Sequence, residues 1–143
     1  MDAQATQAFV QEWIDRAWNG RELTLVDRYM GSEYQLHQSD GTEVRGPEQF
    51  KGYMLQLLNA FSDLHFTVHD VIAQGDRVAW RVIGRGTHDG PLHGVEPTGR
   101  TIEVNALILS TIAEGRWVED FVIIDSLSIL VQLGIIPAPT AAV

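Results

Sequence analysis

The stretch TIEVNALILSTIAEGRWVEDFVII, residues 101–124, indicates the fold class of this chain more strongly than any other segment. Apolar residues recur at alternate positions from Ile102 to Ile112 and again from Trp117 to Ile124, with Glu114-Gly115 between the two runs. A period of two residues is typical of β-strands, and a short glycine-bearing break between two such runs predicts a hairpin. The segment therefore predicts two long antiparallel strands.

Two more strands are predicted upstream of this hairpin. Alternating apolar residues mark residues 66–71 and 78–82, and Gly75-Asp76 predicts the turn between them. Residues 89–100, DGPLHGVEPTGR, hold three glycines and two prolines, which predicts a loop before the hairpin.

Helical spacing of apolar residues dominates the first part of the chain. It predicts helices over residues 4–19, 23–30 and 46–61. A short strand is expected at 33–38, and a last helix over 126–133 would begin at Asp125 as its N-cap and end at Gly134. Helices followed by an antiparallel sheet predict an α+β fold, in which the hollow of the curled sheet, packed against the N-terminal helices, encloses one pocket.

Length and composition exclude several classes of protein. The 143 residues predict a single domain over 1–143, and a formal net charge of −9 argues against a nucleic-acid partner. No apolar run reaches the length of a membrane span, and the N-terminus lacks the pattern of a signal peptide, so we expect no membrane association and a cytoplasmic location. The absence of cysteine excludes disulfides and thiol chemistry.

Two segments resemble a known family. Residues 86–100, GTHDGPLHGVEPTGR, and residues 113–134, AEGRWVEDFVIIDSLSILVQLG, are similar to segments of the SnoaL-like polyketide cyclase, or ester cyclase, family. The helix start at Gly46-Pro47-Glu48 agrees with that family as well. The resemblance implies the cone-shaped fold of the nuclear transport factor 2-like superfamily, usually as a homodimer and without a cofactor.

The resemblance also implies a reaction, the intramolecular aldol closure of a polyketide ester by an Asp and a His. Those two positions correspond here to Val122 and Ile108, and neither side chain can exchange a proton. Epoxide opening by relatives needs an Asp-Arg-Asp set, one member of which also falls on Val122. Ketosteroid isomerization needs a Tyr/Asp pair deep in an apolar cavity, and the sequence alone places none.

If Ile108 and Val122 point inward, the period of two also turns Asp120 inward. A carboxylate among apolar neighbours is desolvated, which raises its pKa and suits it to act as a base. The alternative is a different register, with Asp120 exposed beside Glu119. His88 and His37 are the candidate groups for orienting this base or polarizing a substrate oxygen. For His88 the alternative is a hydrogen bond to loop backbone, and for His37 a structural or exposed position.

The remaining predicted pocket residues are aromatic or apolar side chains and one loop histidine that could close the mouth; they are Trp18, Tyr53, Trp80, Ile108, Val122 and His93. Core packing is the alternative for Trp18, Tyr53 and Trp80, and Phe50 is assigned to the core. No metal site is predicted, because the histidines lack the spacing of a helical site.

Two functions remain open at this point. The first is a cofactor-independent cyclase or isomerase acting by acid/base chemistry on an apolar, oxygenated, enolisable small molecule. The second is a small-molecule-binding protein without chemistry, which the apolar residues at positions 108 and 122 would suit. Outward residues Leu107, Leu109 and Phe121 further predict a homodimer through the outer face of the sheet.

Overall fold

The computed structural model describes residues 1–139 and has the predicted helices and strands in order, with one short strand at Glu43–Arg45 that was not predicted. A π-helical segment, η1 (Trp13–Trp18), continues the first helix directly. The α-helices are α1 (Ala3–Glu12), α2 (Leu25–Tyr29), α3 (Gly46–Ala60) and α4 (Ser126–Gln132). The strands are β1 (Met30–Gln38), β2 (Glu43–Arg45), β3 (His65–Gln74), β4 (Arg77–Thr87), β5 (Thr101–Ala113) and β6 (Arg116–Ile124).

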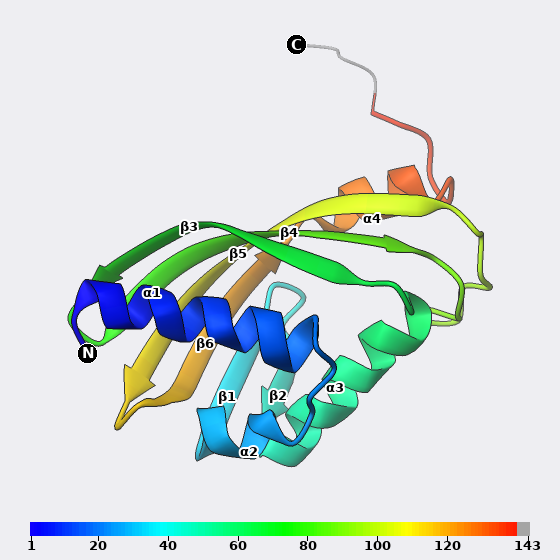
Figure 1. Cartoon of the computed structure of the whole chain (residues 1–143). Helices are drawn as coiled ribbons and strands as arrows, with labels where there is room; N and C mark the ends of the chain where they lie inside the picture. Colours follow the sequence, from blue (N-terminus) through cyan, green and yellow to red (C-terminus); the bar gives the residue numbers. More distant parts are fainter. Residues whose placement is uncertain (140–143) are drawn as a thin grey trace.

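The strands form one six-stranded sheet in the order β2-β1-β6-β5-β4-β3. Figure 1 shows that the sheet curls without closing and that α1, α2 and α3 lie in its hollow. The predicted α+β cone is therefore confirmed. One detail of the sheet differs from the expectation of a purely antiparallel arrangement, because β1 pairs with β6 in parallel while the other neighbours pair antiparallel.

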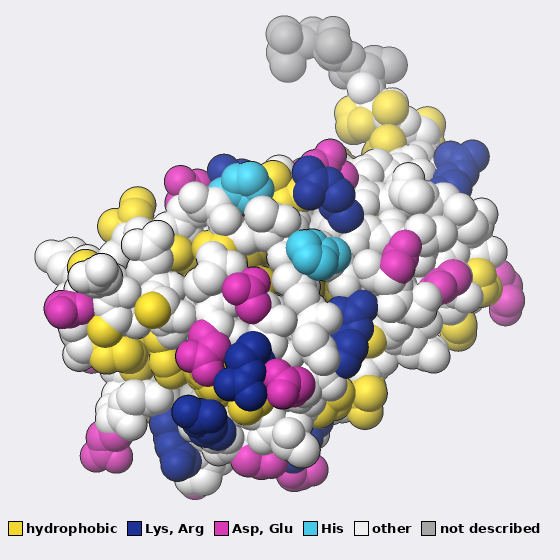
Figure 2. All heavy atoms as spheres, in the orientation of Figure 1, with side chains coloured by type: hydrophobic (Ala, Val, Ile, Leu, Met, Phe, Trp, Pro, Cys, Tyr) yellow, Lys and Arg dark blue, Asp and Glu magenta, His cyan; other side chains and the backbone are white. Residues whose placement is uncertain are grey.

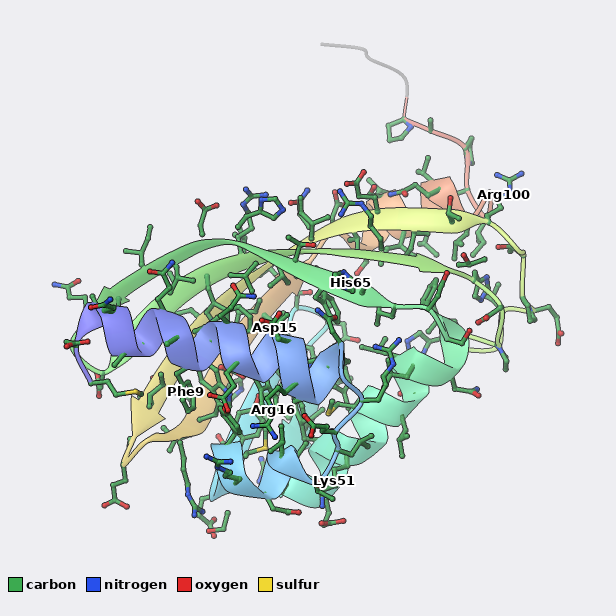
Figure 3. The ribbon with its side chains drawn as sticks, viewed as in Figure 1. Phe9, Asp15, Arg16, Lys51, His65 and Arg100 are labelled. Carbon is green, nitrogen blue, oxygen red and sulfur yellow. The ribbon has the colours of Figure 1, made fainter. Side chains whose placement is uncertain are left out.

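The first helical layer is held at both ends by polar contacts. The Asp2 carboxylate accepts a hydrogen bond from the Ala5 amide at 2.7 Å and caps α1. After η1, the Asn19 side chain binds both backbone groups of Phe66 on β3, at 2.8 and 2.9 Å. Figure 3 shows Phe9 on the side of α1 that faces the sheet, whereas Arg16 reaches toward α2 and pairs with Glu22 at 3.0 Å.

The core lies between this helical layer and the concave face of the sheet. Along β4 and β5 every second residue is buried or half-buried, as the period of two predicts. The indole rings of Trp80 and Trp117 stack with centroids 5.8 Å apart and join two strands across the inner face. The central helix α3 contributes Phe50 and Met54 to the same layer. These aromatic contacts enclose the hollow of the sheet.

The loop after β4 is clamped at its base. The His88 amide donates to the Arg100 carbonyl at 2.8 Å, and the Gly99 amide donates to the His88 carbonyl at 2.9 Å. Gly90 lies so close to α3 that a Cβ atom there would come within 1.9 Å of the Asn59 carbonyl oxygen. Only glycine can bring the loop backbone this near to the end of the helix.

The surface carries both signs of charge. On the face formed by α1, α2 and α3, Figure 2 shows acidic and basic side chains interleaved, without a large patch of one sign. Within residues 1–139, none of the helices combines the length and the apolar character that crossing a membrane requires.

Candidate active site

A cavity of about 90 Å³ lies between the helices and the concave face of the sheet. Its lining is almost entirely aromatic and aliphatic; the polar side chains are Tyr34, Tyr53, Asp120 and the indoles of Trp13, Trp18 and Trp80. Two larger hollows, of about 250 and 510 Å³, lie on the surface, and their titratable side chains are exposed. The small cavity is thus the place where a carboxylate is enclosed by apolar residues, as in a ligand site.

Asp120 is the carboxylate in this cavity. Its neighbours across the sheet are Leu36 on β1 and Ser110 on β5, so the register of three strands turns all three side chains to the concave face. The Tyr34 hydroxyl donates a hydrogen bond to Asp120 Oδ2 at 2.5 Å, and the Ser110 hydroxyl donates to Asp120 Oδ1. The inward orientation expected for Asp120 is therefore the one observed, with only 8% of its surface exposed.

A fourth residue fixes the direction of these hydrogen bonds. The Trp80 indole Nε1–H donates to Ser110 Oγ at 2.9 Å. An indole can only donate, so the Ser110 oxygen accepts from Trp80 and its own hydrogen points to Asp120. The hydrogen bonds therefore form one chain of four residues. One arm runs from Trp80 through Ser110 to Asp120 Oδ1, and the other runs from Tyr34 to Asp120 Oδ2.

Burial dominates the electrostatics of this chain. Loss of water raises the pKa of Asp120 from 3.8 to about 6, against the lowering effect of the hydrogen bonds from Ser110 and Tyr34, while the charge of Glu119 adds to the rise. Burial and the nearby Asp120 charge raise the pKa of Tyr34 well above its ordinary value. Burial likewise raises the pKa of Tyr53 to about 12. Near neutral pH the cavity therefore combines two neutral phenols with a carboxylate close to its titration point.

The predicted aromatic and apolar pocket residues all line this cavity; they are Trp18, Tyr53, Trp80, Ile108 and Val122. Phe50, assigned to the core, lines it as well and packs against Trp18 and Tyr53, with ring centroids 6.1 and 5.6 Å away. Trp18 comes from the π-helical segment, a rare conformation that is frequent near functional sites.

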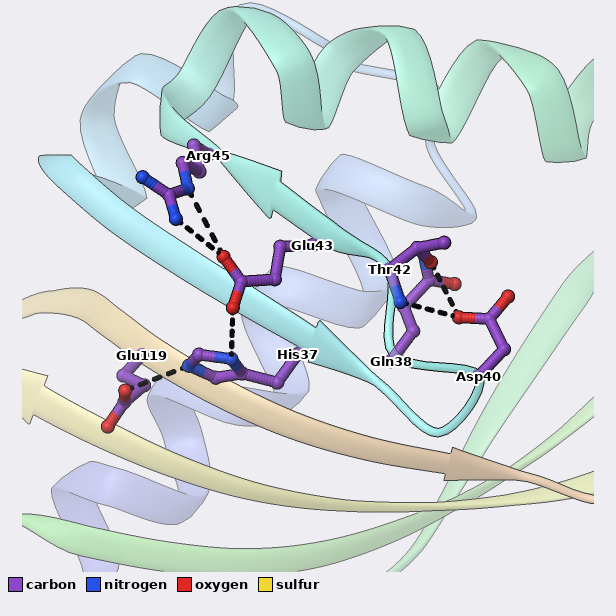
Figure 4. Close-up of polar contacts among 7 residues, drawn as sticks. All are labelled: His37, Gln38, Asp40, Thr42, Glu43, Arg45 and Glu119. Atoms are coloured by element: carbon purple, nitrogen blue, oxygen red, sulfur yellow. Dashed lines mark hydrogen bonds and ion pairs between the residues drawn. The ribbon is translucent and has the colours of Figure 1, made fainter.

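His37 lies on the other face of the sheet. Its Nε2 is 2.9 Å from the Glu119 carboxylate and its Nδ1 is 3.4 Å from Glu43, as Figure 4 shows. Its ring stacks on Phe121 with centroids 4.4 Å apart. His37 therefore does not orient Asp120, and the alternative stated for it, a structural or exposed position, is the arrangement observed. Tyr34 and Leu36 occupy the inward positions of β1, and adjacent residues of a strand point to opposite faces.

His88 is buried but does not line the cavity. It directly follows Thr87, the last residue of β4, and the centroid of its ring is 5.4 Å from that of Phe61. Its Nδ1 accepts from the Thr98 amide at 3.2 Å, which places the ring hydrogen on Nε2, where no partner is found among the described residues. The alternative stated for His88, a hydrogen bond to loop backbone, is the arrangement observed.

His93 is exposed in the loop and also does not line the cavity. The predicted place of His93 at the cavity is therefore not the one observed. Among the residues lining the cavity in the described part of the chain there is no arginine, so the Asp-Arg-Asp set of epoxide opening is not assembled here. Within residues 1–139 no three His, Asp or Glu side chains gather closely enough to hold a metal ion.

Tyr34 is the site residue that the sequence analysis missed. A Tyr/Asp pair in an apolar cavity could not be placed from the sequence, and yet Tyr34 and Asp120 form one. The signal was present in the alternation of β1, where Tyr34 and Leu36 are the apolar positions and Gln35 and His37 the polar ones. That pattern assigns Tyr34 to the inner face and His37 to the outer face.

Comparisons with known proteins agree with this geometry. The sequence profile of the family described as SnoaL-like polyketide cyclase matches residues 8–133. A candidate SnoaL-like polyketide cyclase from Jannaschia sp. CCS1 is 25% identical, with 91% of this chain and 92% of that chain covered and a TM-score of 0.83. AclR, a candidate hydroxylase from Streptomyces galilaeus, is 27% identical over 98% of this chain and 87% of its own, with a TM-score of 0.85.

IdmH, a candidate polyketide cyclase from Streptomyces antibioticus, is 30% identical, with 90% of this chain and 97% of that chain covered and a TM-score of 0.78. Among curated proteins no sequence matches significantly. The similar structures thus carry names of both cyclases and a hydroxylase, and one fold serves more than one reaction.

Proposed function

This chain belongs to the SnoaL-like polyketide cyclase family, and from that membership we propose that it is an acid/base cyclase or isomerase acting on an apolar, enolisable, polyketide-like small molecule. The observation that carries the proposal is the buried carboxylate of Asp120, which faces an apolar cavity and has a pKa raised to about 6 by burial. A base near its titration point both accepts and returns a proton efficiently. No such group stands at the family's usual positions, which are Ile108 and Val122 here.

The proposed chemistry is the removal of a proton next to a carbonyl. One Asp120 oxygen takes the proton as the C–H bond breaks, and the electron pair moves onto the carbonyl oxygen to give an enolate. In an isomerization Asp120 returns this same proton to another carbon of the enolate. In a cyclization the enolate carbon attacks a second carbonyl carbon, whose oxygen becomes an alkoxide, and Asp120 returns the proton to that oxygen. The cavity volume of about 90 Å³ suits the reacting fragment of a substrate. The rest of a larger molecule would occupy the mouth after rim side chains such as Leu57 move.

The test is turnover by Asp120→Asn. The amide keeps the size of the side chain but cannot act as a base, so we expect a loss of at least about 100-fold in kcat on any substrate that wild type converts. Asp15→Asn, on the exposed side of the first helical layer, is the matched control and should retain full activity. Wild-type activity in Asp120→Asn would remove Asp120 from the mechanism.

A binding protein without chemistry is the second candidate, favoured by the apolar side chains Ile108 and Val122 that line the cavity. A ligand that stabilises the protein and is recovered unchanged supports this candidate, because binding to the folded state raises the melting temperature by mass action. Recovery of a converted product excludes it.

We also propose that the molecule is a homodimer through the outer face of the sheet. Leu107, Leu109, Phe121 and Ile123 are 40% to 63% exposed on β5 and β6, and a monomer seldom leaves such a patch in water. Sedimentation should show a dimer for wild type and a monomer for Leu109→Asp. A wild-type species of 15.9 kDa would contradict the proposal.

A further inference from the structure

The hydrogen-bond chain around Asp120 can be counted hydrogen by hydrogen. Its three bonds run from Trp80 to Ser110, from Ser110 to Asp120 and from Tyr34 to Asp120. Three hydrogens are available for them, namely one indole N–H and two hydroxyl hydrogens. When Asp120 is ionised, every hydrogen of the chain is used within it, and the Tyr34–Asp120 pair has none to offer a ligand.

One added proton changes this count. Ser110 must donate to Oδ1, because its oxygen already accepts from Trp80, so the new proton belongs on Oδ2, beside Tyr34. The protonated Oδ2 can donate to the Tyr34 oxygen, which frees the Tyr34 hydrogen, or it can direct its own hydrogen away from Tyr34. In both arrangements four hydrogens serve three bonds. The extra hydrogen must enter the cavity, since Tyr34 and Asp120 are buried and both line it.

We propose that the Tyr34–Asp120 pair gives the cavity a hydrogen-bond donor only in its neutral form, and that this donor selects ligands that bury a ketone or enolate oxygen against it. The inference deepens the proposed function and rests on it for the assumption that the cavity takes an oxygenated ligand. It assigns Tyr34 a role in specificity that neither histidine can fill, since both lie outside the cavity.

The same count connects binding with catalysis. When the ionised Asp120 takes the proton from the carbon next to a carbonyl, the chain gains its fourth hydrogen. The donor therefore forms at the moment when the substrate oxygen becomes an enolate, the species that most needs a hydrogen bond. Because Tyr34 Oη and Asp120 Oδ2 are 2.5 Å apart, one can face the oxygen and the other the adjacent carbon of the substrate.

The titratable groups near Asp120 leave it as the source of this pH dependence. Tyr34 on β1 and Tyr53 on α3 stay neutral, since burial raises the pKa of both phenols. Glu119 is next to Asp120 in sequence but pairs with His37 on the outer face. No Lys, Arg or His of residues 1–139 lines the cavity. Tyr53 makes no hydrogen bond to any described residue, so it is a donor at every pH and contributes no change.

The test is the pH dependence of binding, with no turnover required. Cyclopentanone is the probe, and methylenecyclopentane, which has the same shape without the oxygen, is its control. For wild type we expect the Kd of the ketone to be about threefold to tenfold lower near pH 5.5 than near pH 7.5, the range of one neutral hydrogen bond. The Kd of the hydrocarbon should not change. The infrared carbonyl stretch of bound ¹³C-labelled ketone should shift to lower frequency at the lower pH.

The variants separate this mechanism from a general effect of pH. In Asp120→Asn the amide donates permanently to Tyr34, so tight ketone binding should persist near pH 7.5 without pH dependence. Asp15→Asn, on the exposed side of the first helical layer and away from the cavity, should keep the wild-type affinity and its pH dependence. Equal ketone affinity of wild type at both pH values, or no ketone binding at all, overturns the inference. Failure of turnover with the predicted binding intact would instead reject only the enzymatic proposal.

Discussion

Replacement of Asp120 by Asn should make the protein more stable at neutral pH. Burial raises the pKa of Asp120 from 3.8 to about 6, so the folded state binds the proton more tightly than the unfolded state. A group of this kind costs stability above its folded pKa, and the cost disappears as the pH falls through 6 toward 4. At 1.36 kcal/mol per pKa unit, ionised Asp120 lowers the free energy of unfolding by about 3 kcal/mol near pH 7.5.

Asparagine avoids this cost but adds a smaller one. The asparagine carbonyl would accept from Ser110, and one amide hydrogen would bind the Tyr34 oxygen. The second amide hydrogen would have no partner in this series of hydrogen bonds. An unpaired buried donor costs about 1 kcal/mol or more. The net expectation is that Asp120→Asn unfolds with a free energy about 2 kcal/mol higher than wild type near pH 7.5, and that this gain shrinks to about zero near pH 4.5.

Urea unfolding of both proteins at the two pH values measures this difference. Asp63→Asn is the contrasting variant, because hydrogen bonds from the Thr87 amide and hydroxyl lower the pKa of Asp63. It should lose stability at neutral pH, and the loss should diminish as the pH falls. If Asp120→Asn is less stable than wild type near pH 7.5, or if its difference does not vary with pH, the carboxylate is not held at an energetic cost and the argument for a poised base fails.

Three further predictions follow from the same contacts. Ser110→Ala removes the hydrogen bond that lowers the pKa of Asp120, so the acidic limb of the pH–activity profile should move to higher pH; an unmoved limb would separate Ser110 from the titration. His37→Gln should leave kcat and KM at wild-type values in steady-state assays, because the ring lies on the outer face, and a tenfold loss of kcat would restore the histidine to the mechanism. Gly90→Ala should destabilise the protein by about 3 kcal/mol or more in urea unfolding, since its methyl group would overlap the Asn59 carbonyl at 1.9 Å; a stability equal to wild type would show that the loop can shift at little cost.

The residues that the sequence placed correctly are those whose neighbours set a clear period. The inward prediction for Asp120 starts from the resemblance, which implies that Ile108 and Val122 face inward, and the period of two then turns Asp120 inward as well. It holds because both strands are long enough to keep one register. The capping role of Asp125 was also local, and its carboxylate does accept from the Ser128 amide. Local patterns of this kind need no knowledge of distant contacts.

What the sequence could not supply was the pairing of distant strands. Nothing in the period of β1 says that its neighbour is β6 or that the two run in parallel, so the contact of Tyr34 with Asp120 was out of reach. The period of two residues also does not show how far along a strand a side chain lies relative to the cavity. His88 was predicted to orient the base, but it lies outside the cavity, where the loop contacts decide its partners.

The parallel contact between β1 and β6 has a consequence for how the molecule is made. Tyr34 and Asp120 are 86 residues apart in the sequence. Pairing over such a separation requires the closure of a long loop and belongs to the slow events of folding. As the ribosome extends the chain, the β3–β4 hairpin can form before β6 has emerged. The Tyr34–Asp120 pair then assembles only when the last strand docks beside the first. Every partly synthesised or partly folded form therefore lacks the proposed base with its tyrosine partner, and the candidate site exists only in the completed sheet.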